Sequence, residues 1–143
     1  MSIEDNKNLS KKLFEEVWNK GNLDVVDDLI ALDYVIHMGN KDLVGIDNYK
    51  NFVKIYRNAF PDIYYTVNDL IAEDDKVVER WSAQGTHKGE LLGIPPTNKK
   101  LKVTGIDIVR IKEGKMVERW AEYDFKGMME QLGVIKSLNM QNP

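Results

Sequence analysis

The stretch "ERWAEYDFKGMMEQLG", residues 118–133, changes its periodicity partway along. Its first part alternates as a β-strand does, with Trp120 and Asp124 on one side and Arg119 on the other. Its second part has a helical spacing of apolar residues around Met128. The stretch therefore predicts a strand that leads directly into a C-terminal helix, with Asp124 at the junction.

The remainder of the chain places helices first and strands afterwards. Helical spacing predicts three N-terminal helices, and β-branched and aromatic residues predict a brief strand at 33–37 and then four longer strands. The predicted helices begin near Ser2, Asn22 and Gly45, and the longer strands span 63–72, 76–86, 101–111 and 115–123. Two of the connections are short enough for antiparallel hairpins and no βαβ alternation occurs, so we expect an α+β fold.

This order of elements predicts a cone. The apolar face of a strongly curved, mostly antiparallel sheet must be covered by other elements. The three N-terminal helices are the only predicted elements large enough to cover it. A sheet wrapped around them, followed by a short C-terminal helix, would leave a pocket where helices and sheet do not touch, and such a gap suits a small molecule. The length predicts a single domain over residues 1–143.

Composition narrows the classes of partner. The net charge is −3 and the basic residues are scattered, which argues against a nucleic-acid-binding surface. The absence of cysteine excludes disulfides, thiolate metal sites and a cysteine nucleophile. The sequence has neither an apolar run long enough to span a bilayer nor the pattern of a secretory signal at its start. We therefore expect a cytoplasmic protein without a membrane partner.

Five stretches of the second half carry a resemblance to a known family: Ala59–Asp62, Gly85–Glu90, Gly93–Thr97, Gly105–Ile108, and Gly114–Trp120 leading to Asp124. Together they resemble the SnoaL-like polyketide cyclase (ester cyclase) family, within the cone-shaped, cystatin-like group that includes ketosteroid isomerase and nuclear transport factor 2. The resemblance covers about residues 5–135. It implies the cone fold and chemistry that needs no cofactor.

The same resemblance implies roles for particular residues. An aspartate matching Asp124 would remove a proton from a carbon flanked by carbonyl groups, and the resulting enolate would close a ring by aldol addition. His37 would help by orienting the substrate and stabilising its oxyanion. Asp107 stands where many relatives have a histidine, and if it faced the pocket together with Asp124, mutual repulsion would raise the pKa of one of them.

Each catalytic assignment has a plainer alternative. Asp124 directly precedes a predicted helix, so its carboxylate can serve as an N-cap. His37 can simply end a strand at the surface. No close ligand spacing joins His37 to His87, and no carboxylate cluster accompanies them in sequence, so we expect no metal site.

Other residues are predicted to line the cavity and contact the ligand. The aromatic residues among them are Trp18, Tyr56, Trp81 and Trp120, which serve as core or as cavity wall. Arg80 lies within a predicted strand, where it either pairs with an acidic residue across the sheet or points into the cavity to hold an anionic group. Asp107 completes the predicted binding residues.

These observations lead to one leading hypothesis and two others. The leading one is a cofactor-independent acid/base enzyme that acts on a small hydrophobic carbonyl compound through an enolate, with Asp124 as base and His37 as helper. The alternative is a protein of the same fold that binds a small hydrophobic ligand without chemistry. Alternation also places apolar residues on both faces of the sheet, so we expect a homodimer formed through the sheet whatever the pocket does.

Overall fold

The computed structural model describes residues 2–136. The helical elements are α1 (Ile3–Lys12), the π-helix η1 (Leu13–Asn19), the 3₁₀ turn η2 (Leu23–Val25), α2 (Val26–Leu29), α3 (Ile46–Ala59) and α4 (Phe125–Leu132). The strands are β1 (Ile30–Met38), β2 (Lys41–Val44), β3 (Tyr64–Glu73), β4 (Lys76–Thr86), β5 (Lys100–Lys112) and β6 (Lys115–Tyr123). None of the helices within this range has the length and apolar character needed to cross a bilayer.

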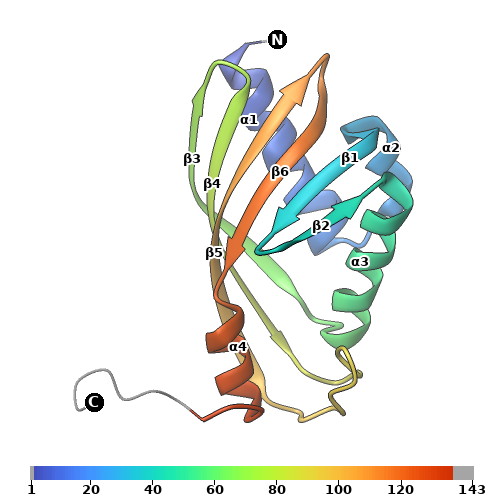
Figure 1. The fold of residues 1–143 in the computed structure, drawn as a ribbon, viewed down its shortest axis with the longest axis vertical. Coiled ribbons are helices and arrows are strands. Elements are labelled where there is room, and N and C mark those ends of the chain that lie inside the picture. The colour runs from blue at the N-terminus through green and yellow to red at the C-terminus, as the bar shows by residue number, and fades with distance from the viewer. Residues whose placement is uncertain (1, 137–143) are drawn as a thin grey trace, which may run out of the picture.

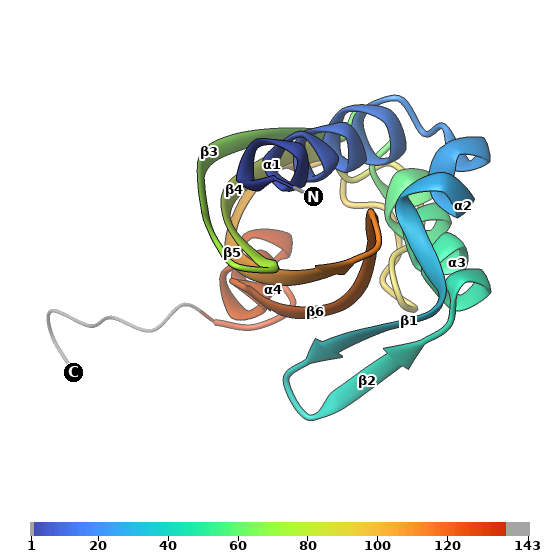
Figure 2. The ribbon, with the colours of Figure 1, turned by 90° about the horizontal axis from the view of Figure 1, so that it is seen from above.

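The six strands form one curved sheet in the order β2-β1-β6-β5-β4-β3. Neighbouring strands are antiparallel, except that β1 runs parallel to β6. The sheet is strongly curved, and α1 and α3 lie along its concave side (Figure 1 and Figure 2). This is the predicted α+β cone, and the prediction of its architecture is confirmed.

The predicted elements agree closely with the observed ones in the second half of the chain. The strands predicted at 76–86 and 115–123 have the observed bounds, and the third helix and the C-terminal helix are present. The first half differs more, and its predicted second helix is only the short elements η2 and α2. The strand predicted at 33–37 is longer, and it forms a hairpin with β2, which the sequence analysis did not predict because "KDLV" is too short and too polar to show alternation.

One tetrapeptide occurs twice in the sheet with opposite orientations. The sequence Val-Glu-Arg-Trp fills residues 78–81 of β4 and residues 117–120 of β6. In β4 the glutamate and the tryptophan are buried in the cone, whereas in β6 the arginine is buried and its two neighbours are not. A shift of one residue turns every side chain of a strand to the other face. The same four residues therefore direct Glu and Trp inward in β4 but Arg inward in β6.

A β-bulge in β6 explains part of this difference. Arg110 pairs with Glu118, but the next residue of β5, Ile111, pairs with Met116, so Val117 is an extra residue in β6. The bulge places Met116 and Arg119 on the same concave face, although simple alternation assigns them to opposite faces. The inner face of β6 beyond the bulge therefore begins at Arg119.

Candidate ligand pocket

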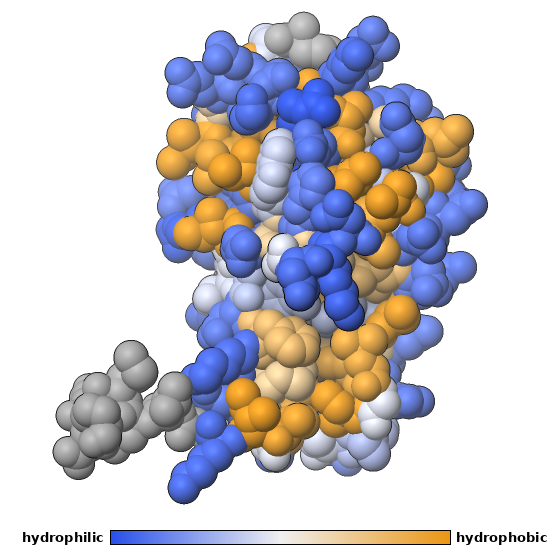
Figure 3. Space-filling model, in the orientation of Figure 1, coloured by the Kyte–Doolittle hydropathy of each residue, from blue (hydrophilic) through white to orange (hydrophobic). Residues whose placement is uncertain are grey.

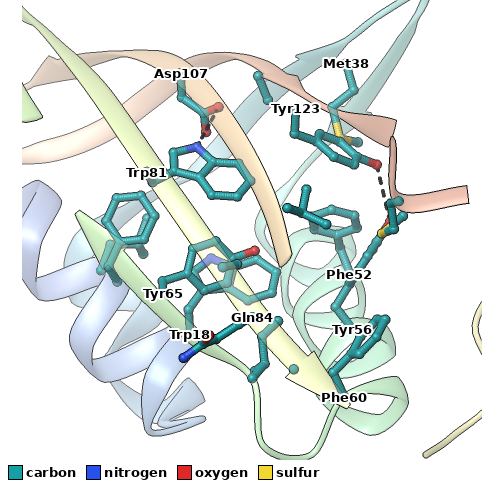
Figure 4. A pocket seen from close by; sticks show the side chains of 18 of the residues that line it. Trp18, Met38, Phe52, Tyr56, Phe60, Tyr65, Trp81, Gln84, Asp107 and Tyr123 are labelled. Carbon is teal, nitrogen blue, oxygen red and sulfur yellow. Dashed lines mark hydrogen bonds between the residues drawn. The ribbon is translucent and has the colours of Figure 1, made fainter. Parts of the chain in front are cut away.

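The hollow of the cone is a pocket with an aromatic wall. The ring of Tyr65 lies 5.0 Å from Trp18 and 5.1 Å from Trp81, measured between centroids, and Phe52 lies 5.9 Å from Trp18 and 5.0 Å from Tyr56. These five rings come from η1, α3, β3 and β4, and all of them line the pocket (Figure 4). The cavity has a volume of about 100 Å³. A single water needs roughly 10–15 Å³ of such space, so there is room for a small organic molecule.

Hydrogen bonds fix the helical wall against the sheet. Asn19 at the end of η1 accepts from the Tyr65 backbone at 2.6 Å and donates to its carbonyl oxygen at 3.0 Å. The Trp18 indole donates to the Tyr49 hydroxyl at 3.1 Å, and the Arg57 guanidinium donates to the Trp18 carbonyl oxygen. Because the C-terminal carbonyls of a helix lack intrahelical donors, Arg57 acts as a cap that holds Trp18 at the pocket wall.

A buried ionic cluster forms one part of this wall. The guanidinium of Arg119 donates to Glu79, to Asp107 Oδ2 at 2.8 Å and to the Tyr34 hydroxyl at 2.7 Å. The indole of Trp81 donates to the other carboxylate oxygen, Asp107 Oδ1, at 3.2 Å (Figure 4). All five residues are less than 9% exposed, and Asp107, Arg119 and Trp81 belong to the pocket lining.

The cluster carries one more negative than positive charge when both of its carboxylates are ionised and Tyr34 is neutral, because two carboxylates share one guanidinium. Burial raises the pKa of Glu79, and the nearby Arg119 opposes that rise. Burial likewise raises the pKa of Tyr34 to about 12, so this hydroxyl stays neutral. The raised pKa of Glu79 reflects the cost of burying a negative charge in this cluster.

Small residues keep the space beside the cluster open. On the inner face of the sheet Gly105 lies opposite Tyr123, and Asp107 lies opposite Ala121. A Cβ atom at Gly105 would come within 2.2 Å of the Trp81 indole, so the indole lies directly over this glycine. Position 105 therefore requires glycine. The absence of a side chain there lets the Trp81 indole point its N–H toward Asp107.

Four of the predicted site residues line the pocket: Asp107, Trp18, Tyr56 and Trp81. That they bind a ligand stays a prediction. The other four, Trp120, His37, Asp124 and Arg80, lie outside the pocket lining. None of these four has the cavity-facing placement, which for Asp124, His37 and Arg80 was one of two alternatives.

Trp120 and His37 face the convex side of the sheet. Their positions are opposite each other on β6 and β1, and their rings lie 5.5 Å apart. Trp120 is 37% exposed, and the two ring nitrogens of His37 are bonded to Glu118 at 2.7 Å and Asp42 at 2.8 Å. Alternation correctly grouped Trp120 with Glu118, but it did not reveal that this face is the outer one.

Asp124 is the N-cap of α4, which was the plainer of its two predicted roles. Its carboxylate accepts from the Gly127 backbone at 2.9 Å, its own backbone N–H donates to Thr104 at 3.0 Å, and its side chain is exposed. Arg80 also follows the plainer alternative. It is exposed and pairs with Asp69 at 2.6 Å across the β3–β4 ladder.

Three polar residues of the pocket and its ionic cluster were not among the predicted site residues and matter for the chemistry: Glu79, Arg119 and Tyr123. A usable signal existed for Glu79, because alternation places it on the face of Trp81, which was predicted to line the cavity. Arg119 and Tyr123 alternate with Trp120, so the wrong choice of inner face in β6 hid both of them. Within residues 2–136, no group of three or more His, Asp or Glu side chains is placed to hold a metal ion.

A curved sheet closed by helices over an aromatic pocket defines a cone-shaped α+β protein. The pattern of the SnoaL-like polyketide cyclase family matches residues 8–132, and the chain belongs to that family, as the resemblance predicted.

Individual relatives agree with this assignment. The chain is similar to nogalonic acid methyl ester cyclase of Streptomyces nogalater, with 29% identity over 125 residues that cover 81% of this chain and 89% of the relative. It is also similar to aklanonic acid methyl ester cyclase DnrD of Streptomyces peucetius, with 28% identity over 123 residues, 82% of this chain and 84% of the relative. A solved structure of a polyketide cyclase candidate from Acidithiobacillus ferrooxidans has a TM-score of 0.81 and 31% identity, covering 94% of this chain and 99% of the other.

Proposed function

We propose that the protein is a cyclase-type enzyme that acts on a small hydrophobic carbonyl compound by acid/base chemistry without a cofactor. The observation that carries the proposal is the position of Asp107, a buried carboxylate in the wall of an aromatic pocket, held there by hydrogen bonds from Arg119 and Trp81. The reactions named for the curated relatives, both of them ester cyclases, support a ring closure.

The proposed reaction begins with proton removal by Asp107. The carboxylate takes a proton from a carbon next to a carbonyl group, and the electron pair of that C–H bond moves into an enolate. The enolate carbon then attacks a second carbonyl carbon of the same molecule, which forms the C–C bond of the ring and leaves an alkoxide. Asp107 returns its proton to the alkoxide, so the enzyme ends in its starting state.

The proposal moves the role of base from Asp124 to Asp107. A base must reach the proton that it removes, and Asp107 lines the pocket whereas Asp124 does not. The proposal assigns no chemical role to His37, whose two ring nitrogens already bind carboxylates on the convex face. Arg119 holds Asp107 in place and is a positioning residue.

A deuterium exchange experiment tests the proposal. β-Tetralone is a small bicyclic ketone whose acidic protons exchange slowly enough to be followed by proton NMR in heavy water. The wild-type protein should accelerate this exchange above the buffer rate, and Asp107→Asn should lower the acceleration at least about 100-fold, the ordinary contribution of a general base. Asp124→Asn is the matched control and should exchange at the wild-type rate. An Asp107→Asn protein that folds and retains full acceleration would show that another group is the base.

The second candidate function is binding of a hydrophobic ligand without chemistry. The observation in its favour is that both oxygens of Asp107 are already bonded, one to Trp81 and one to Arg119. In that case the wild-type protein should bind β-tetralone and leave its exchange at the buffer rate.

We also propose that the convex face of the sheet forms a homodimer. Ile106, Ile108 and Trp120 are exposed there and adjoin one another across β5 and β6. Figure 3, in the orientation of Figure 1, shows that apolar side chains on this side are interspersed with hydrophilic ones. Light scattering should give twice the mass of one chain, and Ile106→Glu should give the mass of one. A monomeric wild-type protein would contradict the dimer.

A further inference from the structure

Two tyrosine hydroxyls meet in the pocket. Tyr56 comes from α3 and Tyr123 is the last residue of β6, and both belong to the pocket lining. Their hydroxyl oxygens lie 3.3 Å apart (Figure 4). Tyr56 is 8% exposed and packs edge-on against Phe52, while Tyr123 is half-buried and packs edge-on against Phe125. Elements distant in sequence thus bring two polar groups together inside an apolar wall.

The hydrogen bonding of this pair is incomplete. A hydrogen bond between two hydroxyls uses one O–H proton, so the second proton needs another acceptor. Among residues 2–136, neither hydroxyl has a hydrogen-bond partner other than the opposite one. The separation of 3.3 Å also exceeds the usual 2.5–3.0 Å for O–H···O bonds, so the bond between the two hydroxyls is weak. The pair therefore offers at least one donor that the folded protein does not satisfy.

The electrostatic surroundings keep the buried member of the pair a donor. Burial raises the pKa of Tyr56 well above its ordinary value, and the neighbouring Tyr123 raises it further. A phenol with a raised pKa remains protonated at neutral pH and can donate a hydrogen bond. What the pair lacks is an acceptor, which a bound molecule can supply.

We propose that the hydroxyls of Tyr56 and Tyr123 form the binding site for a carbonyl oxygen of the ligand, which accepts one hydrogen bond from each. The ligand class is a compact, otherwise apolar ketone or related carbonyl compound. The inference rests on the proposed function, because it places the carbonyl group of the substrate class named there. When the enolate forms, negative charge develops on this oxygen, and both hydroxyls stabilise it.

The position of the pair relative to Asp107 fits one bound molecule. Gly105 pairs with Tyr123 and Asp107 pairs with Ala121, so Asp107 and Tyr123 are diagonal neighbours on the same face of the sheet. Diagonal neighbours are roughly 7–8 Å apart at their backbones, which long side chains can span. Gly105 and Ala121, at the other corners of this square, add little bulk between them. A carbonyl oxygen on the tyrosines can therefore leave the adjacent C–H group beside Asp107.

A comparison of two ligands of the same shape tests the inference. β-Tetralone and tetralin differ only in the carbonyl group, and the fluorescence of the pocket tryptophans reports the binding of each. The wild-type protein should bind β-tetralone more tightly than tetralin. Tyr56→Phe and Tyr123→Phe should each reduce that affinity ratio about 5-fold, the loss expected for one hydrogen bond, and tetralin affinity should stay within about 2-fold. Tyr64→Phe, an exposed tyrosine of β3 outside this pocket, is the matched control and should leave the ratio unchanged.

The infrared stretch of the bound carbonyl gives a second measurement that needs no variant. In the wild-type complex the stretch of β-tetralone should shift to lower wavenumber than in a hydrocarbon solvent, because the oxygen accepts hydrogen bonds. An unshifted stretch would overturn the inference. So would equal affinity of the wild-type protein for the two ligands, failure of β-tetralone to bind, or an unchanged ratio in both phenylalanine variants.

These outcomes separate the inference from the proposed function. Loss of the affinity ratio in the tyrosine variants without any catalysed exchange supports the carbonyl site and rejects the enzyme. Catalysed exchange that depends on Asp107 but not on the tyrosines supports the enzyme and rejects the carbonyl site.

Discussion

Replacing Arg119 with methionine should destabilise the protein strongly and in a pH-dependent way. Arg119 is 5% exposed and is the cation that compensates both Glu79 and Asp107. Methionine fills a similar length of apolar space but leaves two buried carboxylates without a positive partner. Breaking a buried ion pair by removing one member costs about 3–5 kcal/mol in the free energy of unfolding. With a urea m-value of about 2 kcal/mol/M, the midpoint should fall by roughly 2 M.

The sign of the pH dependence follows from Glu79. Burial raises its pKa above the usual 4.5, and Arg119 is the strongest influence that lowers it. Removing Arg119 therefore raises this pKa further. For an acid whose folded pKa is raised, the stability contribution is fully present below the unfolded value and is lost as the pH rises through the folded value. Arg119→Met should thus be least damaging near pH 4.5 and most damaging well above it.

The assay is urea unfolding of the wild-type protein and Arg119→Met at about pH 5 and pH 8. Arg110→Met is a matched control, because Arg110 pairs with Glu118 at 3.1 Å in a partly exposed position, where an ion pair contributes at most about 1 kcal/mol. A destabilisation of Arg119→Met that is the same at both pH values, or no larger than that of Arg110→Met, would refute the description of the cluster.

Three further predictions concern single residues. Gly105→Ala should displace the Trp81 indole, because the new Cβ would lie 2.2 Å from it, and should cost about 1–3 kcal/mol in urea unfolding together with weaker tetralin binding. Hydrogen bonds to Glu118, and to a second carboxylate, raise the pKa of His37, so its ring resonances in NMR should titrate with a midpoint above 6.5. The stabilisation from this histidine is then complete below about pH 6.5 and is lost as the pH rises through that midpoint. Asp124→Ala should cost about 1 kcal/mol through loss of the helix cap, whereas Asp124→Asn should cost little, since asparagine caps as well as aspartate does.

The fold could be predicted from the sequence because the patterns that define it are local. Helical spacing ahead of Pro61 and alternation in residues 76–86 and 115–123 each belong to one element, and those elements appear with the expected bounds. The order of helices and strands then leaves few ways to cover the sheet, and the cone is one of them. The short strand β2 escaped detection because four residues with two charges carry no alternation to read.

The site was harder to predict from the sequence, because its residues depend on which face of β6 turns inward. The two copies of Val-Glu-Arg-Trp have the same local preference, and only their pairing with β5 decides which side chains are buried. The bulge at Val117 adds to the difficulty, since no residue in "KMVERW" marks it. Because the predicted inner face of β6 was wrong by one residue, Trp120 was assigned to the pocket in place of Arg119 and Tyr123. For the same reason Asp124, which is a helix cap, was predicted to be the base.

Some site residues could be predicted from the sequence, because their environment does not depend on which face of β6 turns inward. Trp18 and Tyr56 lie on the apolar stripes of their helices, and Trp81 lies in β4, where the observed burial follows simple alternation along the strand. Asp107 was singled out by the family resemblance, since it stands where a histidine is common. The ionic cluster around Asp107 could not be predicted, because it joins residues 79, 107 and 119 from three strands. The sequence alone does not give the register of these strands relative to one another.

The most direct test of the account is a crystal structure of the wild-type protein with β-tetralone bound. The account predicts the ketone inside the cone, with its oxygen within hydrogen-bond distance of the hydroxyls of Tyr56 and Tyr123 and its acidic carbon beside the carboxylate of Asp107. A ketone bound on the convex face beside Trp120, or one inside the cone with its oxygen turned away from both tyrosines, would contradict it.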